Sequence, residues 1–588
     1  MPHTLYASID GRASPLANQE VVFYDPARDQ THAMTAQVLQ ALDLCRPFRT
    51  LDRHIATLSS ALTGLSGQED AIRRVLEGLV ARGLLISDES WLDQLGRSGQ
   101  HEPTEFAGMF IRAGGAPQRL KGLLDSLLAY EQAFAPGHRY VLIDDGDDAH
   151  ASEHRALLAA FGRAAEVRTH HVGRDVRARL AAALEGMSPG SAAHDLLACR
   201  RGGGVAPGAV RNLVSLLTAG RRYLLLDEDM RLPFHRHAEP PRGLDVAART
   251  PVDVVLLPGL DEALADGQPL DDDPLQIHLR LCGASLGDLI NRAPGFELRR
   301  ENLVELEPSR LPYLKAGCRV LATAVGVRGT AAPGPWLFQL DGTAGETFRA
   351  DRERYLRLVE QPAWRCVPTR MQLRVAGELD ALMVDNSTPT PCAPAHGAHA
   401  ERLYASLWRA MSPSAVSAHV PATLATAATR ADPGWLKRPL SPDSHAYLAD
   451  LVAHTSSEVR ASDPWARMGA IAERLRDLAG ASDRALRIEL REYHAFARSS
   501  LIQSMQHAFE RAAQTAPVHW QADLRLVIES NGRALIDGGE PRLADAGEAD
   551  SAEHALRRAL NAQAAAMDAW PALWQSARDS AEKLWKLL

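Results

Sequence analysis

The sequence lacks the features that mark secreted, membrane-bound and zinc-stabilised proteins. Its six cysteines form no C-x-x-C pair, which argues against a zinc ribbon or a disulfide framework and indicates a reducing compartment. The N-terminus has no basic segment followed by an apolar one, and no run of about 18 apolar residues occurs. We therefore expect a cytoplasmic protein without a membrane partner.

A surplus of positive charge is also missing. The formal net charge is -8, whereas a protein whose main task is to bind nucleic acid usually presents a basic face to the phosphates. We therefore expect no nucleic-acid partner. The sequence carries no indication of an oligomeric state.

The length of 588 residues exceeds what one hydrophobic core usually organises. Changes in pattern along the chain predict three units, which are residues 1–98, residues 105–430 and residues 431–588. The last unit reads as helical, because its apolar residues recur at a spacing near 3.6.

The first unit has the pattern of a winged helix. Residues 20–35 alternate like a hairpin. One helix is expected from residue 36, a second after a cap at Thr50, and a third that ends at Gly83 before a short strand. This stretch resembles the PqqD-like domains of ribosomal peptide maturation, which capture a leader peptide as an added strand. An ordinary winged helix used for dimerisation or DNA binding is the alternative.

The second unit alternates strands with helices, which predicts an α/β fold with a mostly parallel sheet covered by helices on both faces. Ligands of such sheets bind beyond the carboxyl ends of the strands. Two acidic clusters fall at predicted strand ends, Asp144-Asp145 in "VLIDDGDD" and Asp227-Glu228-Asp229 in "RYLLLDEDM". A ligand site is therefore expected where these two ends meet.

The order of these motifs, with the helix "PGAVRNLVSLL" before the second cluster, resembles glycosyltransferases of the GT-A fold, and most closely the large family-2-like group. The resemblance implies that Asp144 and Asp145 contact the base and ribose of a nucleotide. It also implies that the D-x-D motif, Asp227 and Asp229, holds Mn or Mg against the diphosphate of a UDP-sugar.

The chemistry of a departing diphosphate supports a cation at this position. A divalent ion stabilises the negative charge of that leaving group, and Mg and Mn prefer carboxylate oxygens. In an extended segment Asp227 and Asp229 point to the same side, so that one carboxylate can bind metal while the other holds a ribose hydroxyl or a metal-bound water. Arginines bound to both side chains would contradict this interpretation.

Other candidate residues follow from the resemblance. Arg112 closes the first strand where the first loop of the family meets the nucleotide, and Arg211 lies on the helix that approaches the diphosphate. His419 stands where a late histidine completes the metal shell, and His235 and His237, just beyond the D-x-D motif, are further possible ligands.

A transferase that inverts the anomeric centre also needs a carboxylate that takes the proton of the acceptor. The Pro-rich loop "VDNSTPTPCAPAHGAHAERLYASLW" offers Asp385 and Glu401, and Glu401 is preferred because it enters a helix. The acidic doublet usual for the family is absent from this loop.

These patterns together predict a metal-dependent glycosyltransferase that moves a sugar from a UDP-sugar to a peptide or protein acceptor, as in the maturation of a ribosomally made peptide. Two other hypotheses stay open. One is a nucleotidyltransferase, because "IRAGGAPQRLKG" also fits a glycine- and arginine-containing first loop. The other is a catalytically silent binding protein.

Overall fold

We describe a computed structural model of the chain. It describes residues 4–588 except 17–19, 26–27, 63, 98–100, 191, 198–205, 242, 247–251, 293–294, 309–310, 312–313, 315–316, 376–380, 398, 428–432, 513 and 548–549. Within these residues the protein is mixed α/β, with a large sheet flanked by helices. None of the helices in the described ranges is long and apolar enough to cross a membrane.

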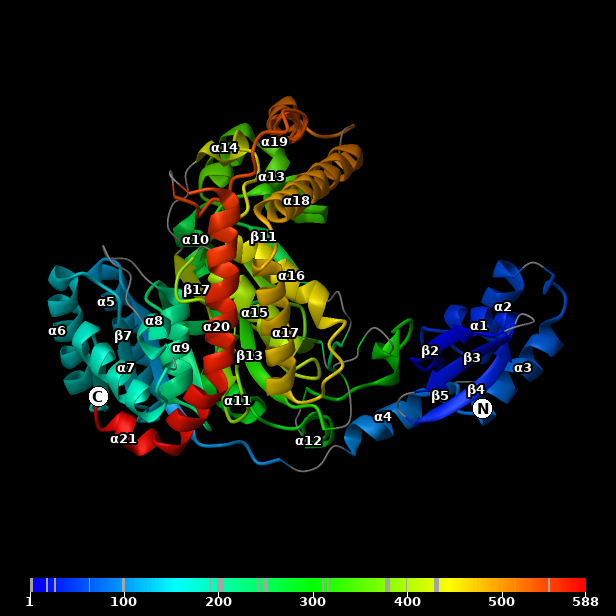
Figure 1. Cartoon of the computed structure of the whole chain (residues 1–588), viewed down its shortest axis with the longest axis horizontal. Helices are drawn as coiled ribbons and strands as arrows, with labels where there is room; N and C mark the ends of the chain where they lie inside the picture. The colour runs from blue at the N-terminus through cyan, green and yellow to red at the C-terminus, as the bar shows by residue number, and fades with distance from the viewer. Residues whose placement is uncertain are drawn as a thin grey trace.

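The N-terminal residues form a separate lobe of short strands and helices (Figure 1). Its elements are β1 (Tyr6–Ser8), β2 (Arg12–Pro15), β3 (Glu20–Asp25), β4 (Gln30–Thr35), α1 (Ala36–Leu44), α2 (Leu51–Ala61), α3 (Glu69–Ala81), β5 (Leu85–Ser87) and α4 (Asp88–Gly96). Strand β1 pairs with β5, while β2, β3 and β4 form an antiparallel sheet.

The predicted hairpin and helices of this lobe are confirmed. Strands β3 and β4 pair across residues 20–35, and the side chain of Thr50 caps α2 by accepting a hydrogen bond from the amide of Arg53. Gly83 follows α3 with a φ of 71°, in the left-handed region that favours glycine. The lobe has its own core, which includes Phe23 and Leu76.

The described residues of the central sheet form 12 strands, most of them in the order β12-β10-β17-β13-β16-β9-β6-β7-β8. The strands are β6 (Phe106–Ala113), β7 (Tyr140–Asp144), β8 (Thr169–Val172), β9 (Arg222–Asp227), β10 (Met230–Arg236), β11 (Val252–Leu256), β12 (Gln268–Pro269), β13 (Val320–Thr330), β14 (Ala363–Pro368), β15 (Gln372–Val375), β16 (Ala381–Asp385) and β17 (Val416–Ala427). Strands β8, β7, β6 and β9 are parallel, and β16 runs antiparallel between β9 and β13. The sheet is therefore mixed, with a parallel half that contains both acidic clusters.

Helices cover both faces of the sheet. They are α5 (Pro117–Phe134), α6 (Asp148–Ala164), α7 (Arg174–Met187), α8 (Ala193–Leu197), α9 (Pro207–Leu217), α10 (Leu260–Ala265), α11 (Pro274–Leu281), α12 (Leu286–Arg292), α13 (Gly342–Ala350), α14 (Arg352–Glu360) and α15 (Ala400–Met411). Neighbouring residues of β6 enter different cores, because successive side chains of a strand point to opposite faces. Phe110 belongs to the cluster under α9 and α15, whereas Met109 and Ile111 belong to the cluster under α5 and α11.

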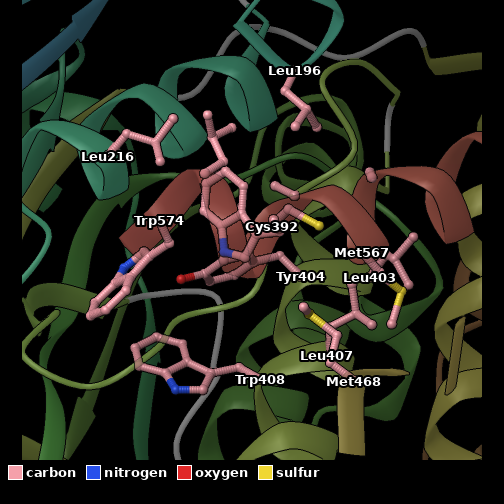
Figure 2. Close-up of a cluster of buried hydrophobic side chains, with 14 of the residues drawn as sticks. Leu196, Leu216, Cys392, Leu403, Tyr404, Leu407, Trp408, Met468, Met567 and Trp574 are labelled. Atoms are coloured by element: carbon pink, nitrogen blue, oxygen red, sulfur yellow. The ribbon is translucent and has the colours of Figure 1, made fainter. Parts of the chain in front are cut away.

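The predicted helical character of the last part of the chain is confirmed. Its helices are α16 (Ser444–Ser456), α17 (Pro464–Ala479), α18 (Asp483–Ala512), α19 (Val518–Ile536), α20 (Ala552–Asp579) and α21 (Ala581–Trp585). Figure 2 shows Met567 and Trp574 of α20 in one cluster with Leu216 of α9 and Trp408 of α15. The boundary predicted at residue 431 therefore does not separate two hydrophobic cores.

The N-terminal lobe contacts the main body at Asn291, Arg300, Glu305 and Leu306. The amide of Phe48 donates to the carbonyl of Leu306 at 2.8 Å, and the amide of Glu305 donates to the carbonyl of Phe48 at 3.1 Å. The guanidinium of Arg49 also contacts both carboxylate oxygens of Glu305, at 2.9 and 2.8 Å from Nε. These contacts fix the lobe beside the body, as Figure 1 shows.

Candidate functional site

The candidate site lies where the order of the parallel strands reverses. The chain passes from β6 to β7 and β8 on one side and then returns to β9 on the other side of β6. In open α/β sheets such a switch point leaves a crevice beyond the carboxyl ends of the two adjoining strands. Arg112 of β6 and Asp227 of β9 are paired in register at this position.

Arg112 connects Asp227 with Glu401 of α15. Its Nε and Nη2 donate to Oδ1 and Oδ2 of Asp227 at 2.6 and 2.8 Å, and its Nη1 donates to Oε1 of Glu401 at 2.8 Å. Burial lowers the pKa of Arg112, but the charges of Asp227 and Glu401 outweigh this effect and raise it above its usual value. The guanidinium is thus permanently charged.

Arg211 of α9 contacts the same oxygen of Glu401. Its Nη2 lies 3.3 Å from Oε1, and its guanidinium carbon lies 4.7 Å from the centre of the Tyr404 ring. The side chain of Arg211 is only 7% exposed, and its Nε has no hydrogen-bond partner among the described residues. Burial raises the pKa of Glu401, but Arg211 and Arg112 lower it by more, so Glu401 is a carboxylate at neutral pH.

The other two acidic residues of the motif point elsewhere. Glu228 accepts hydrogen bonds from the amides of Gly114 and Gly115 at 3.0 and 3.1 Å. Asp229 accepts one from the hydroxyl of Thr426 at 3.3 Å, and burial, followed by the charge of Asp227, raises its pKa. Strand β9 ends at Asp227, so strand alternation does not place Asp227 and Asp229 on one side, contrary to our expectation.

A cavity of about 140 Å³ opens at this charged cluster. Arg112, Arg211, Asp227 and Glu401 form its polar wall. Its other lining residues are Leu225, Met230, Val325, Val327, Leu382, Leu424, Ala425 and Thr426. Most of these other lining residues come from β13, β16 and β17, and no sequence pattern predicts them, because the positions of these strands beside β9 depend on long-range pairing.

The acidic residues of the D-x-D motif do not form a preformed metal site in this conformation. Both oxygens of Asp227 are held by Arg112, and Glu228 is held by two backbone amides. Over the described part of the chain, no group of three or more His, Cys, Asp or Glu side chains could hold a metal ion. A cation at Asp227 would have to displace the Arg112 guanidinium.

His419 is not brought to the aspartates. It lies on β17 opposite Gln372 of β15, and its Nε2 is 3.1 Å from the hydroxyl of Ser417. Thr426, which contacts Asp229, is seven positions further along the same strand, a separation of about 20 Å at the usual rise per residue. We correct the expectation that His419 completes a metal shell with Asp229.

Asp385 lies at the opposite end of the sheet from the cavity. Because β16 is antiparallel to β9, Asp385 pairs with Arg222 at the start of β9. It is buried, forms an ion pair with Arg319 and accepts a hydrogen bond from the amide of Ser387 at 3.0 Å. Asp385 is therefore a structural residue and not the proton acceptor that the loop position suggested, whereas Glu401 does reach the cavity.

Asp144 and Asp145 follow β7 as expected, but both are buried in internal contacts away from the cavity lining. Asp144 contacts His154 at 3.1 Å and His171 at 2.8 Å, and these hydrogen bonds outweigh burial and hold its pKa well below the usual range. Asp145 pairs with Arg177 at 2.6 Å. In this conformation neither carboxylate is available to a nucleotide.

The two histidines beyond the D-x-D motif have structural partners. Nδ1 of His235 lies 2.7 Å from the carbonyl of Asp266, and Nε2 of His237 lies 2.7 Å from the hydroxyl of Thr423. These hydrogen bonds account for the orientation of both rings without a metal ion.

A second, wider cleft of about 1050 Å³ lies in the main body. It is lined by Val420, Pro421 and Ala422 of β17, by part of α11 and by Gly295. Strand β17 therefore contributes to both openings, with residues 420–422 in the wide cleft and residues 424–426 in the small cavity.

Comparisons of the chain with protein-family models, with curated proteins and with solved structures find no match.

Proposed function

We propose that the protein is a glycosyltransferase that moves a sugar from a nucleoside-diphosphate sugar to a peptide. The observation that carries this proposal is the cluster of Arg112, Asp227, Arg211 and Glu401 around a cavity at the β6–β9 switch point. This cluster offers two guanidinium groups for a diphosphate and one carboxylate for a proton, which are the groups that such a transfer requires.

The arrangement of the parallel strands supports a GT-A-like body. The first acidic pair follows β7 and the D-x-D motif follows β9, on the two sides of β6. This is the order that the resemblance in the sequence implies. In the proposed reaction an acceptor oxygen, sulfur or nitrogen attacks the anomeric carbon, and the bond from that carbon to the diphosphate breaks. The nucleoside diphosphate departs with the electron pair, and Glu401 takes the proton of the acceptor.

The N-terminal lobe is proposed to select the peptide. Strand β4 is an edge strand among the described residues, and an edge strand can pair with an extended peptide through main-chain hydrogen bonds. An apolar groove of about 230 Å³ is lined by α1, α2 and α3. Its lining includes Val38, Ala41, Leu62, Ile72 and Val75. The PqqD-like character of the lobe, implied by the sequence, fits this role.

The wide cleft supports the approach of an acceptor to the cavity. Its lining reaches Ala422 of β17, two residues before the lining of the small cavity. We propose that the acceptor lies along this cleft, from which β17 leads to the cavity that Glu401 lines.

The donor specificity can be tested by incubating the full-length protein with UDP-glucose, UDP-galactose, UDP-N-acetylglucosamine and GDP-mannose, with and without Mn²⁺, and with the peptides encoded next to its gene. We expect release of the nucleoside diphosphate with one of these donors and loss of this release in Arg112→Ala. Arg476→Ala is the matched control, because Arg476 forms an exposed ion pair with Asp568 far along the chain.

Two results would contradict the proposal. One is that no donor in the panel is consumed under either metal condition. The other is release of pyrophosphate from a nucleoside triphosphate, which would identify a nucleotidyltransferase instead.

A further inference from the structure

Glu401 occupies a position that suits a phosphate oxygen. A single oxygen, Oε1, accepts from Nη1 of Arg112 at 2.8 Å and contacts Nη2 of Arg211 at 3.3 Å. Two guanidinium groups that converge on one anionic oxygen form the arrangement by which arginines commonly hold phosphate groups. The carboxylate of Glu401 therefore marks an anion site between the two arginines.

Asp227 positions Arg112 for this contact. It binds Nε and Nη2 of the guanidinium, which leaves Nη1 directed at Glu401. A planar guanidinium held along one edge presents its remaining N–H groups in a fixed direction. In this arrangement both oxygens of Asp227 are used for orienting an arginine, and none is left for a metal ion.

Arg211 has binding capacity that the described residues do not use. Its side chain is 7% exposed, it lines the cavity, and its Nε lacks a hydrogen-bond partner among the described residues. A buried donor without a partner is costly, so such a group in a native protein points to a ligand or a water that completes the site.

The volume and the charge of the cavity limit what this ligand is. A cavity of about 140 Å³ is smaller than the roughly 300 Å³ or more of a site that encloses a whole small molecule, so it accommodates a part of a ligand such as phosphate groups. Without Glu401, the charges of Arg112, Arg211 and Asp227 sum to one positive charge, which attracts an anion.

We propose that Arg112 and Arg211 bind the diphosphate of the donor in place of a metal ion, and that the diphosphate displaces Glu401 from the arginines. This inference rests on the proposed function. The side chain of Glu401 is 30% exposed and belongs to the first turn of α15, so it has room to leave the arginines. Once it leaves them, Glu401 is released to take the proton of the acceptor, and the donor therefore binds before the acceptor reacts.

The test is calorimetric titration of the full-length protein with inorganic pyrophosphate in EDTA. We expect binding without metal, weakened about 30-fold or more in Arg112→Ala and in Arg211→Ala. In Glu401→Gln we expect binding about tenfold tighter, because the competing charge is removed while the shape is kept. Arg476→Ala should bind like the unmodified protein.

The Glu401→Gln result separates binding from folding, since a misfolded variant cannot gain affinity. Pyrophosphate binding that requires Mn²⁺ would overturn the inference, and so would weaker binding by Glu401→Gln than by the unmodified protein.

The inference and the proposed function fail in different ways. Transfer that is abolished by EDTA and restored by Mn²⁺ would overturn the arginine site but support the glycosyltransferase. Metal-free pyrophosphate binding with the expected pattern of variants, but without turnover of any nucleotide sugar, would support the arginine site and overturn the glycosyltransferase.

Discussion

At the scale of single residues, burial decides the charge of several histidines in the main body. His278 of α11 is fully buried, its Nδ1 lies 2.8 Å from the hydroxyl of Thr323, and the ring of Phe234 packs against it edge-on. Burial alone lowers the pKa of His278 to about 3, far below the usual value for histidine. The ring is therefore neutral at every pH at which the protein is expected to work.

This neutral ring makes stability depend on pH. The unfolded chain binds a proton at His278 near pH 6.5 and the folded chain only near pH 3, so stability falls as the pH drops below 6.5. His278→Gln keeps a polar group opposite Thr323 but does not titrate. Between pH 7.5 and pH 5 we expect its free energy of unfolding to fall by about 2 kcal/mol less than that of the unmodified protein. Urea unfolding at both pH values measures the difference. Equal losses in the two proteins would show that His278 titrates normally.

Part of the site could be predicted from the sequence, because the charged residues of the site lie at strand ends and a helix start that local patterns predict. Arg112 and Asp227 end predicted strands and Glu401 begins a predicted helix, and all three meet with Arg211 at the cavity. Asp385 was misassigned because strand direction is not encoded locally: the antiparallel course of β16 carries it to the far end of the sheet.

At the scale of elements, the Pro-rich loop before α15 is fixed by α9. The side chain of Asn212 donates to the carbonyls of Leu196 and Ala393 at 3.1 and 2.9 Å, and it accepts from the amide of Ala393 at 2.7 Å. Gly208 lets the same helix approach the loop, since a Cβ there would lie 1.8 Å from the carbonyl oxygen of Pro394. This packing sets the position from which α15 presents Glu401.

Removing the Asn212 side chain should therefore destabilise the body. Asn212→Ala leaves buried backbone groups of Leu196 and Ala393 without partners, and we expect a loss of about 2–4 kcal/mol in the free energy of unfolding. Asn291→Ala is the control, because the side chain of Asn291 donates an exposed hydrogen bond to the carbonyl of Gly96, and this change should alter stability by less than about 0.5 kcal/mol. Equal urea midpoints for the two variants would contradict this role of Asn212.

Elements with strong local signals were predicted well, and their mutual packing was not. The Thr50 cap and the hairpin over residues 20–35 have residue types that define them locally. The helical pattern beyond residue 431 was also recognised, but periodicity does not reveal which surface a helix covers. Only the fold shows that α20 packs on α9 and α15 (Figure 2).

Across the whole chain, the proposed function places peptide selection and sugar transfer in different parts. Val75 lies in the apolar groove of the lobe and is 46% exposed. We expect Val75→Asp to weaken binding of the acceptor peptide about tenfold or more, because it places a charge in an apolar contact. Fluorescence anisotropy with labelled peptides encoded beside the gene measures this affinity.

The matched control is Val518→Asp on α19, where the side chain is 82% exposed and lies outside the groove. It should bind the peptide like the unmodified protein. Unchanged affinity in Val75→Asp would place the acceptor site outside the groove.

The reach of the core under α9 and α15 has a consequence for biosynthesis. This cluster includes residues from Ala107 to Leu584, so it closes only when the last helices have been made, whereas the N-terminal lobe has a core of its own. At the usual rate of translation, roughly 5–20 residues per second, the lobe can fold about 25–100 s before residue 588 is made. Under the proposed function, the nascent protein would be able to capture its peptide on the ribosome during that interval, before it could modify it.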